Sequence, residues 1–162
     1  MRIDEDLFAL AQAVGRAALA RRVRIASAES CTGGLAAGAI TAVPGSSDWF
    51  ECGYVTYSNA AKIRQLAVPA ATLERFGAVS SETALAMAQG ARAASGAQWS
   101  LAITGIAGPA GGSPDKPVGT VCFAWAGAAG SEASVALLPG DRAAIRRESV
   151  RVALQGLLDR LA

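Results

Sequence analysis

VRIASAESCTGG, residues 23–34, joins two patterns that indicate different secondary structures. Residues 23–28 alternate Val, Ile and Ala with Arg and Ser, which favours a short strand. Residues 30–42 follow as a second segment, which ends at the turn cluster VPGSS, residues 43–47. We interpret the junction as a strand that passes through a glycine-containing turn into a helix, the first unit of an α/β fold.

Helical and strand patterns alternate outward from this unit. Residues 4–21 place apolar side chains at helical spacing and predict an amphipathic helix. The other expected strands are 49–57, 101–104, 118–126 and 133–138, and the other expected helices are 58–67, 80–94 and the segment from 141 to the C-terminus. Because this alternation ends in a strand pair, we expect an α/β protein: a three-layer α/β/α sandwich on a mixed sheet.

The composition is typical of a single globular domain. The chain has 162 residues, 52% hydrophobic and 17% charged, so we expect one domain over residues 1–162. The net charge of +2 is too small for the basic face that nucleic-acid binding needs. The N-terminus is acidic where a signal peptide is basic, and the apolar runs are too short to span a bilayer. We therefore expect a cytoplasmic protein with no nucleic-acid or membrane partner.

The chain contains no histidine, which limits its chemistry. Serine–histidine triads, cysteine–histidine dyads and histidine-ligated metal sites are excluded. The cysteines Cys31, Cys52 and Cys122 form no CxxC pair, so neither a zinc site nor a disulfide framework is expected. Any general acid or base must be Lys, Tyr, Cys, Asp or Glu, and we expect no metal and no cofactor.

The turn at residues 28–34 is the first candidate site. A hydroxyl at a helix N-terminus lies beside unpaired N–H groups, which can bind an anion or stabilise an oxyanion. Adjacent glycines allow a ligand to approach the backbone closely. Alternatively, Ser30 or Thr32 caps the helix and the glycines only ease packing.

Lys62 is the second candidate, in the stretch YSNAAK, residues 57–62. With Ser58 or Asn59 as the helix cap, Lys62 falls in the first helical turn, where the helix dipole disfavours a cation. Burial there would destabilise the ammonium form, as a general base requires. The alternative is a solvated surface lysine.

Two later segments are candidates for contact with a ligand. The Gly/Pro-rich stretch 105–117 is long for a compact domain, and its backbone amides could form one wall of a pocket. It lacks the phosphate-binding motifs of nucleotide folds, and it could equally be a tolerated surface loop. Arg142, at the start of the last helix, could hold a phosphate, unless Asp141 caps that helix and the arginines are solvated.

Five stretches of the chain stand in an order that is specific to one family. They are AESCTGG (28–34), VPGSSDWFECGYVTYSNAAK (43–62), GAVSSETALAMAQGA (77–91), ITGIAGPAGGSPDKPVGTV (103–121) and GDRAAIR (140–146). Together they resemble the C-terminal domain of the competence/damage-inducible protein CinA, a family that also occurs as stand-alone nicotinamide-nucleotide amidases. The resemblance spans nearly the whole chain.

The resemblance implies an α/β/α fold on a mostly parallel, mixed five-stranded sheet. It also implies a homo-oligomer, expected to be a dimer, that hydrolyses nicotinamide mononucleotide to nicotinic acid mononucleotide and ammonia in pyridine-nucleotide salvage. The family's nucleophilic serine falls on Ser30 and its lysine on Lys62, and further catalytic positions match Tyr57 and Thr104. The residues expected to contact substrate are Cys31, Thr32, Gly33, Gly34, Gly105 and Arg142.

These roles combine into one expected mechanism with three alternatives. Neutral Lys62 takes the proton of Ser30, backbone amides of residues 32–34 with Thr104 hold the oxyanion, and Tyr57 orients Lys62 or passes the proton. One alternative makes Cys31 the nucleophile, since thiols at helix N-termini can be acidified. Another is a nucleotide-binding or regulatory module without catalysis. A third is an amidase for a different substrate.

Overall fold

The computed structural model describes residues 2–162. Its helices are α1 (Glu5–Arg21), α2 (Leu35–Thr41), α3 (Asn59–Leu66), α4 (Ala70–Phe76), α5 (Ser81–Ser95) and α6 (Arg142–Leu161), with a 3-10 turn η1 (Ser46–Asp48). Its strands are β1 (Ile25–Glu29), β2 (Phe50–Val55), β3 (Trp99–Gly105), β4 (Thr120–Gly127) and β5 (Gly130–Leu137). No helix among residues 2–162 is long and apolar enough to cross a membrane.

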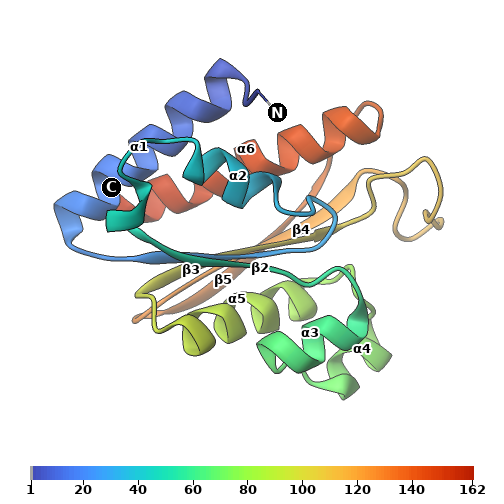
Figure 1. Ribbon diagram of the computed structural model, residues 1–162. Coiled ribbons are helices and arrows are strands. Elements are labelled where there is room, and N and C mark those ends of the chain that lie inside the picture. The colour runs from blue at the N-terminus through green and yellow to red at the C-terminus, as the bar shows by residue number, and fades with distance from the viewer. Residues whose placement is uncertain (1) are drawn as a thin grey trace.

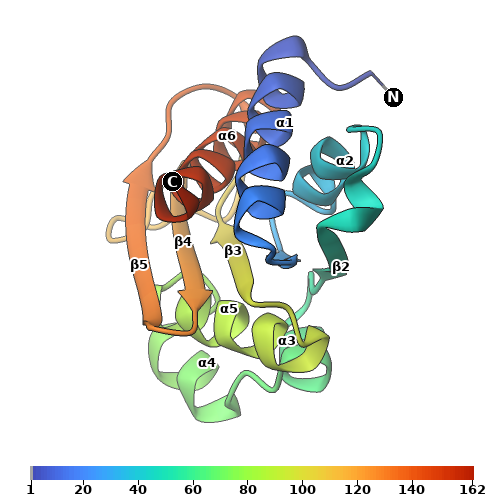
Figure 2. The same ribbon diagram turned by 90° about the vertical axis from the view of Figure 1, so that its left-hand side faces the viewer.

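The elements stack in three layers (Figure 1). Helices α1, α2 and α6 cover one face of the sheet, and α3, α4 and α5 cover the other. The strand order is β2-β1-β3-β4-β5. Strands β2, β1 and β3 are parallel neighbours, while β4 is antiparallel to both β3 and β5, so four strands point one way (Figure 2). The expected three-layer sandwich on a mostly parallel, mixed five-stranded sheet is confirmed.

A hydrophobic core lies on each face of the sheet. The larger core joins α1, α2 and α6 to the sheet through residues such as Leu101, Phe123 and Leu154. The second core joins α5 to the other face through small side chains and Met87. Because β1 and β3 are central, every residue of β1 is buried, which explains why its sequence shows apolar and small residues on both faces.

Two local predictions from the sequence differ from the structure. The sequence pattern predicted no helix between residues 67 and 80, but Pro69 is the N-cap of α4 in this interval. Proline is well tolerated at a helix start because its missing N–H would have no partner there. The first strand begins at Ile25 and includes Glu29, two residues later than expected at its start and one later at its end.

Gly90 sets the distance between α5 and α3. A Cβ atom at this position would overlap the carbonyl oxygen of Leu66, at the end of α3. Helix α3 can therefore lie directly against α5 only because residue 90 has no side chain. This close approach fixes the position of α3, the helix that carries Lys62.

We predict that Gly90→Ala lowers the free energy of unfolding by about 1–3 kcal/mol, the usual cost of overpacking. Gly38→Ala in α2 is the matched control, because a Cβ atom there meets nothing within 4 Å. Removing a glycine from an unobstructed helix interior stabilises by about 0.5–1 kcal/mol. Urea unfolding of both variants measures the two effects, and a Gly90→Ala protein as stable as the Gly38→Ala protein contradicts the packing argument.

Candidate active site

The carboxyl ends of three parallel strands meet at one edge of the sheet and open into a cavity. Such edges are the usual ligand sites of open α/β sheets. Ser30 follows β1, Tyr57 follows β2, and Thr104 and Gly105 end β3. The cavity has a volume of about 290 Å³. It is lined by Ser30, Cys31, Tyr57, Lys62, Ala78, Val79, Thr104, Gly105, Ile106, Ala107, Gly108, Ala110, Gly111 and Arg142.

Ser30 and Lys62 meet inside this cavity, although 32 positions separate them in the sequence. The Nζ atom of Lys62 lies 3.1 Å from the Oγ atom of Ser30. Lys62 is only 1% exposed, so the alternative of a solvated surface lysine is wrong. Ser58 caps α3 by accepting a hydrogen bond from Ala61, which places Lys62 in the first turns of the helix.

The amine of Lys62 has three oxygen partners, and no carboxylate among residues 2–162 pairs with it. It lies 2.9 Å from the carbonyl oxygen of Thr56 and 3.4 Å from that of Tyr57. Burial lowers the pKa of Lys62, because desolvation penalises the ammonium form. The nearby Cys31 thiol opposes this shift only in part. The site therefore favours a neutral amine more than bulk water does.

The turn that holds Ser30, residues 30–34, is not the start of a helix. Helix α2 begins only at Leu35, with Gly34 as its N-cap at φ 102°. The alternative in which Ser30 or Thr32 caps the helix is therefore wrong. We refer to residues 30–34 as the nucleophile turn; its first N–H donates to the Ile103 carbonyl on β3 at 2.9 Å, which ties Ser30 to the sheet.

Glu29, the last residue of β1, accepts hydrogen bonds from the nucleophile turn. Its carboxylate is 1% exposed and accepts hydrogen bonds from the Thr32 hydroxyl at 2.6 Å and the Gly34 N–H at 3.1 Å. It also accepts from Ala36 at 3.0 Å and Ala37 at 2.8 Å in the first turn of α2. A carboxylate thus does what a capping serine was expected to do, and it is favoured there by the helix dipole.

These contacts redistribute the N–H groups of the nucleophile turn. Gly33 donates to the Ser30 carbonyl at 3.0 Å and Gly34 donates to Glu29, so neither is free to hold an oxyanion as expected. Gly33 instead supplies the left-handed backbone of the turn, at φ 58°. Among residues 2–162, no backbone or side-chain oxygen accepts a hydrogen bond from the N–H of Cys31 or Thr32. The Cys31 N–H lies close enough to its own thiol to lower the pKa of that group.

Three expected site residues, Tyr57, Thr104 and Gly105, line the cavity, but the side-chain oxygens of the first two contact other groups. The Thr104 hydroxyl donates to the Ala78 carbonyl at 2.7 Å, so it is not a donor for an oxyanion in this structure. The Tyr57 side chain is 62% exposed and its hydroxyl contacts Arg142, so only its carbonyl faces Lys62. Gly105 lines the cavity. A Cβ atom at this position would collide with Val121, so the close approach of β4 requires a glycine here.

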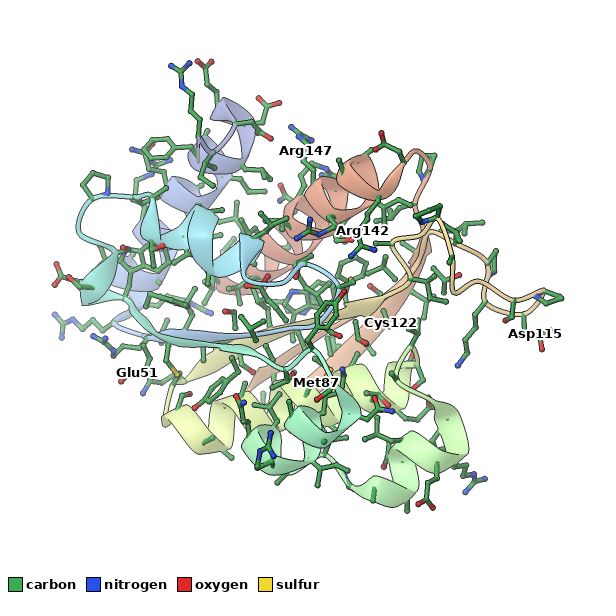
Figure 3. All side chains as sticks on the ribbon, turned by 45° about the vertical axis from the view of Figure 1, so that its right-hand side comes forward. Glu51, Met87, Asp115, Cys122, Arg142 and Arg147 are labelled. Carbon is green, nitrogen blue, oxygen red and sulfur yellow. The ribbon has the colours of Figure 1, made fainter. Side chains whose placement is uncertain are left out.

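Arg142 bridges the rim of the cavity. It is the first residue of α6, after the N-cap Asp141, and lies beside the loop that follows β3 (Figure 3). Its guanidinium donates to the Gly108 carbonyl at 2.9 Å and to the Tyr57 hydroxyl at 3.3 Å. The tip of the loop, marked by Asp115, projects away from the body of the molecule (Figure 3), and the loop residues that line the cavity are 105–108, 110 and 111.

The Cys31 thiol lies beside Ser30 but is poorly disposed to react. It is buried, and desolvation raises its pKa to about 11, with the Glu29 carboxylate adding to the effect. The backbone N–H of Cys31 and the nearby Arg146 and Lys62 side chains offset this shift only in part. Because the thiolate is the nucleophilic form, this environment disfavours Cys31 as a nucleophile.

Two residues that the sequence analysis did not single out hold the nucleophile turn, Glu29 and Arg146. Arg146 donates to the carbonyl oxygens of Cys31 at 3.0 Å and Thr32 at 3.3 Å. Glu29 carries a signal that could have found it, since an acidic residue just before a helix start complements the dipole. Arg146 lies four residues after Arg142 and therefore on the same face of α6.

The described residues offer no ligand set for a metal ion. Within residues 2–162, no three His, Cys, Asp or Glu side chains come together. The polar groups of the cavity are instead a hydroxyl, an amine, a guanidinium and backbone amides. These groups suit an organic substrate with an anionic part.

The fold and the site together define the class of protein: an α/β/α protein with a buried serine–lysine pair at the carboxyl edge of its open sheet. The chain belongs to the CinA C-terminal domain family, whose model matches residues 7–161. It is 56% identical to a nicotinamide-nucleotide amidohydrolase PncC of Pseudomonas putida over 83% of this chain and 84% of that protein. It is 48% identical to that of Escherichia coli K12 over 95% of this chain and 94% of that protein.

Solved structures show the same architecture. The crystal structure of the competence/damage inducible protein CihA from Agrobacterium tumefaciens matches with a TM-score of 0.94 and 42% identity. That match covers 98% of both chains. A CinA superfamily protein from Klebsiella pneumoniae matches with a TM-score of 0.92 and 38% identity over 96% of this chain and 97% of that one.

We predict that Glu29→Gln lowers the free energy of unfolding by about 1–3 kcal/mol, because the amide cannot accept from all four buried donors and leaves some unpaired. Glu51→Gln is the control, since Glu51 pairs with Arg24 on the surface at the far edge of the sheet (Figure 3). Exposed ion pairs contribute about 0–1 kcal/mol. Urea unfolding compares the two variants, and equal losses would show that the buried carboxylate is not special.

Proposed function

We propose that this protein hydrolyses the carboxamide of nicotinamide mononucleotide, giving nicotinic acid mononucleotide and ammonia. The observation that carries the proposal is the buried Lys62 amine, 3.1 Å from the Ser30 hydroxyl inside the cavity. The names of the relatives from Pseudomonas putida and Escherichia coli supply the substrate class. The two cores share one sheet, which supports a single domain over residues 1–162.

The three contacts of Lys62 can serve both of its protonation states. In the structure Lys62 donates to the carbonyl oxygens of Thr56 and Tyr57 and to the Ser30 Oγ atom, as an ammonium with three hydrogens does. When the amine is neutral, its two hydrogens stay on the carbonyl oxygens and its lone pair accepts the Ser30 hydroxyl hydrogen. Burial favours this neutral form. Lys62 thus takes the place that histidine holds in other serine hydrolases, in a chain that has no histidine.

In the acylation step, the Ser30 Oγ atom attacks the carboxamide carbon while Lys62 takes its proton. The electron pair of the C=O bond moves to oxygen and forms the tetrahedral oxyanion. The intermediate then collapses, the C–N bond breaks, and the proton from Lys62 goes to the leaving nitrogen as ammonia departs. Ser30 now carries the acyl group as an ester.

Deacylation uses the same groups. Water attacks the ester carbon and gives its proton to Lys62, and the C–O bond to Ser30 breaks as the proton returns to Oγ. The product is the carboxylic acid, which loses its proton to solvent and becomes a carboxylate. Tyr57 contributes its carbonyl to this relay and not its phenol, because the phenol contacts Arg142.

The N–H groups of Cys31 and Thr32 are our candidates for the oxyanion site. They follow the nucleophile directly and have no oxygen acceptor among residues 2–162. In other serine hydrolases the N–H after the nucleophile has this function. Preorganised donors of this kind usually contribute the largest share of the stabilisation of the transition state.

The charge of the cavity supports a phosphorylated substrate. Of its lining residues described here, Arg142 is cationic, Lys62 is neutral in the form that acts as a base, and none is acidic. Arg142 lies at the rim, where it contacts the hydroxyl of Tyr57 and the carbonyl of Gly108. A phosphate is a stronger acceptor for a guanidinium than either group. We therefore assign the phosphate to Arg142 and the carboxamide to Ser30.

We predict that Ser30→Ala lowers kcat for ammonia release from nicotinamide mononucleotide by about 10³- to 10⁶-fold, as loss of a serine nucleophile does elsewhere. Binding of the nucleotide, measured by calorimetry, should persist, because the phosphate contact remains. Cys31→Ser is the control and should keep most of the activity.

The outcomes of this experiment separate the alternatives. Activity retained in Ser30→Ala but lost in Cys31→Ser would make Cys31 the nucleophile. Nucleotide binding by the wild-type protein without ammonia release would indicate a binding or regulatory module. Ammonia release from free nicotinamide at the same kcat/KM would remove the role of the phosphate.

We predict that kcat/KM rises with pH along an acid limb whose apparent pKa is lower than that of an ordinary lysine, because burial lowers the pKa of Lys62 and the neutral amine is the base. Lys62→Arg keeps the charge but cannot lose its proton, so it should be inactive at every pH. The free energy of unfolding should also rise with pH. Between the lowered pKa of Lys62 in the folded protein and the ordinary pKa in the unfolded chain, the unfolded chain binds more protons. A pH series of activity and unfolding on wild type and Lys62→Arg checks both, and an active Lys62→Arg protein rules out the base.

A further inference from the structure

Arg146 reaches from α6 to the backbone of the nucleophile turn. Its Nε atom donates to the Cys31 carbonyl at 3.0 Å, and its Nη2 atom donates to the Thr32 carbonyl at 3.3 Å. Arg146 is half-buried and is not among the residues that line the cavity. Its contacts are therefore with the turn and not with the space that a substrate would occupy.

The first of these contacts acts on the N–H of Thr32. The Cys31 carbonyl and the Thr32 N–H belong to one peptide unit and point in opposite directions, because the unit is planar and trans. A charged donor on the carbonyl fixes the plane of this unit, so the Thr32 N–H points away from Arg146. It also polarises the unit, which strengthens the N–H as a donor.

The second contact acts on the N–H of Cys31 through one further hydrogen bond. The Thr32 carbonyl, bound by Arg146, shares a peptide unit with the Gly33 N–H. That N–H donates to the Ser30 carbonyl at 3.0 Å, and the Ser30 carbonyl shares a peptide unit with the Cys31 N–H. Each bond in such a chain polarises the next. Both chains begin at Arg146 and end at an N–H without an oxygen acceptor.

We propose that Arg146 is a positioning residue that orients and polarises the N–H groups of Cys31 and Thr32 toward the oxyanion, an inference that rests on the proposed amidohydrolase function. Glu29 holds the donors of the same turn and Arg146 holds its acceptors, so the turn is fixed from two sides. Because negative charge develops on the carbonyl oxygen only in the transition state, the contribution of Arg146 appears in kcat and not in KM.

The kinetic test compares Arg146→Gln, Arg146→Lys and the control Arg147→Gln. Arg147 is the next residue of α6, points outward (Figure 3) and pairs with Asp4. We expect Arg146→Gln to lower kcat about 10- to 100-fold with KM unchanged, in line with the effect of a misplaced or lost oxyanion donor. The kcat of Arg146→Lys should lie between those of Arg146→Gln and the wild-type protein, because one ammonium cannot bind both carbonyls as a guanidinium does. Arg147→Gln should keep the wild-type kcat.

A second measurement follows Ser30 without the nucleotide. In the reaction with a fluorophosphonate, the Ser30 Oγ atom bonds to phosphorus, the P–F bond breaks with loss of fluoride, and Lys62 takes the hydroxyl proton and passes it to solvent. The phosphoryl oxygen then lies where an oxyanion would. Intact mass spectrometry gives the labelling rate, which Arg146→Gln should lower by the same factor as kcat.

The outcomes separate this inference from the proposed function. An unchanged kcat in Arg146→Gln, or a higher KM with the wild-type kcat, overturns the role of Arg146. If Arg146→Gln does not fold, the kcat of Arg146→Lys replaces it as the test. A wild-type kcat in Arg146→Lys overturns the positioning role of Arg146, and a lower kcat at an unchanged Tm supports it. If the wild-type protein releases no ammonia, the proposed function fails, and the rate of fluorophosphonate labelling then tests the inference on Arg146. Slower labelling of Arg146→Gln then supports the inference, and equal or absent labelling overturns it.

Discussion

The buried Glu29 carboxylate is the interaction on which the arrangement of the site depends. It lies at the end of a central strand and is 1% exposed, so its charge must be satisfied by hydrogen bonds. Its four donors come from the nucleophile turn and from the first turn of α2. By accepting these bonds it starts α2 four residues after Cys31 rather than at Ser30. The serine is thereby released from capping and faces the cavity.

Lys62 is subject to the opposite constraint. Glu29 is a buried charge surrounded by donors, whereas the Lys62 amine is buried beside two carbonyl oxygens and a hydroxyl, with no carboxylate bonded to it. Burial without a paired charge destabilises the ammonium form of such an amine and favours loss of its proton. Gly90 allows α5 to lie directly against the end of α3, the helix that carries Lys62. Packing on one face of the sheet thus contributes to the burial that lowers the pKa of Lys62 at its edge.

The sequence predicted the layers and the pair of candidate residues, and it failed where tertiary contacts replace local rules. The alternation of patterns was sufficient for the sandwich, because burial on both faces of the sheet leaves a clear record in β1 and β3. Helix α4 was missed because Pro69 is compatible with both the end and the start of a helix. The start of α2 was misplaced because its cap is a side chain from the preceding strand. No local pattern shows that Glu29 turns back toward the chain that follows it.

The last helix completes the site from the other end of the chain. Arg142 and Arg146 are one helical turn apart on α6, so both point toward the edge where the parallel strands end. Arg142 contacts the rim of the cavity, and Arg146 contacts the carbonyls of the nucleophile turn. Under the proposed function, one helix face thus carries two tasks, contact with the phosphate by Arg142 and control of the backbone beside Ser30 by Arg146. Because α6 packs against α1 and the sheet through a continuous core, the two guanidiniums are held at a fixed spacing relative to Ser30. The site thus brings together a hydroxyl, an amine and, within residues 2–162, two backbone N–H groups without an oxygen acceptor, the groups that the proposed mechanism uses.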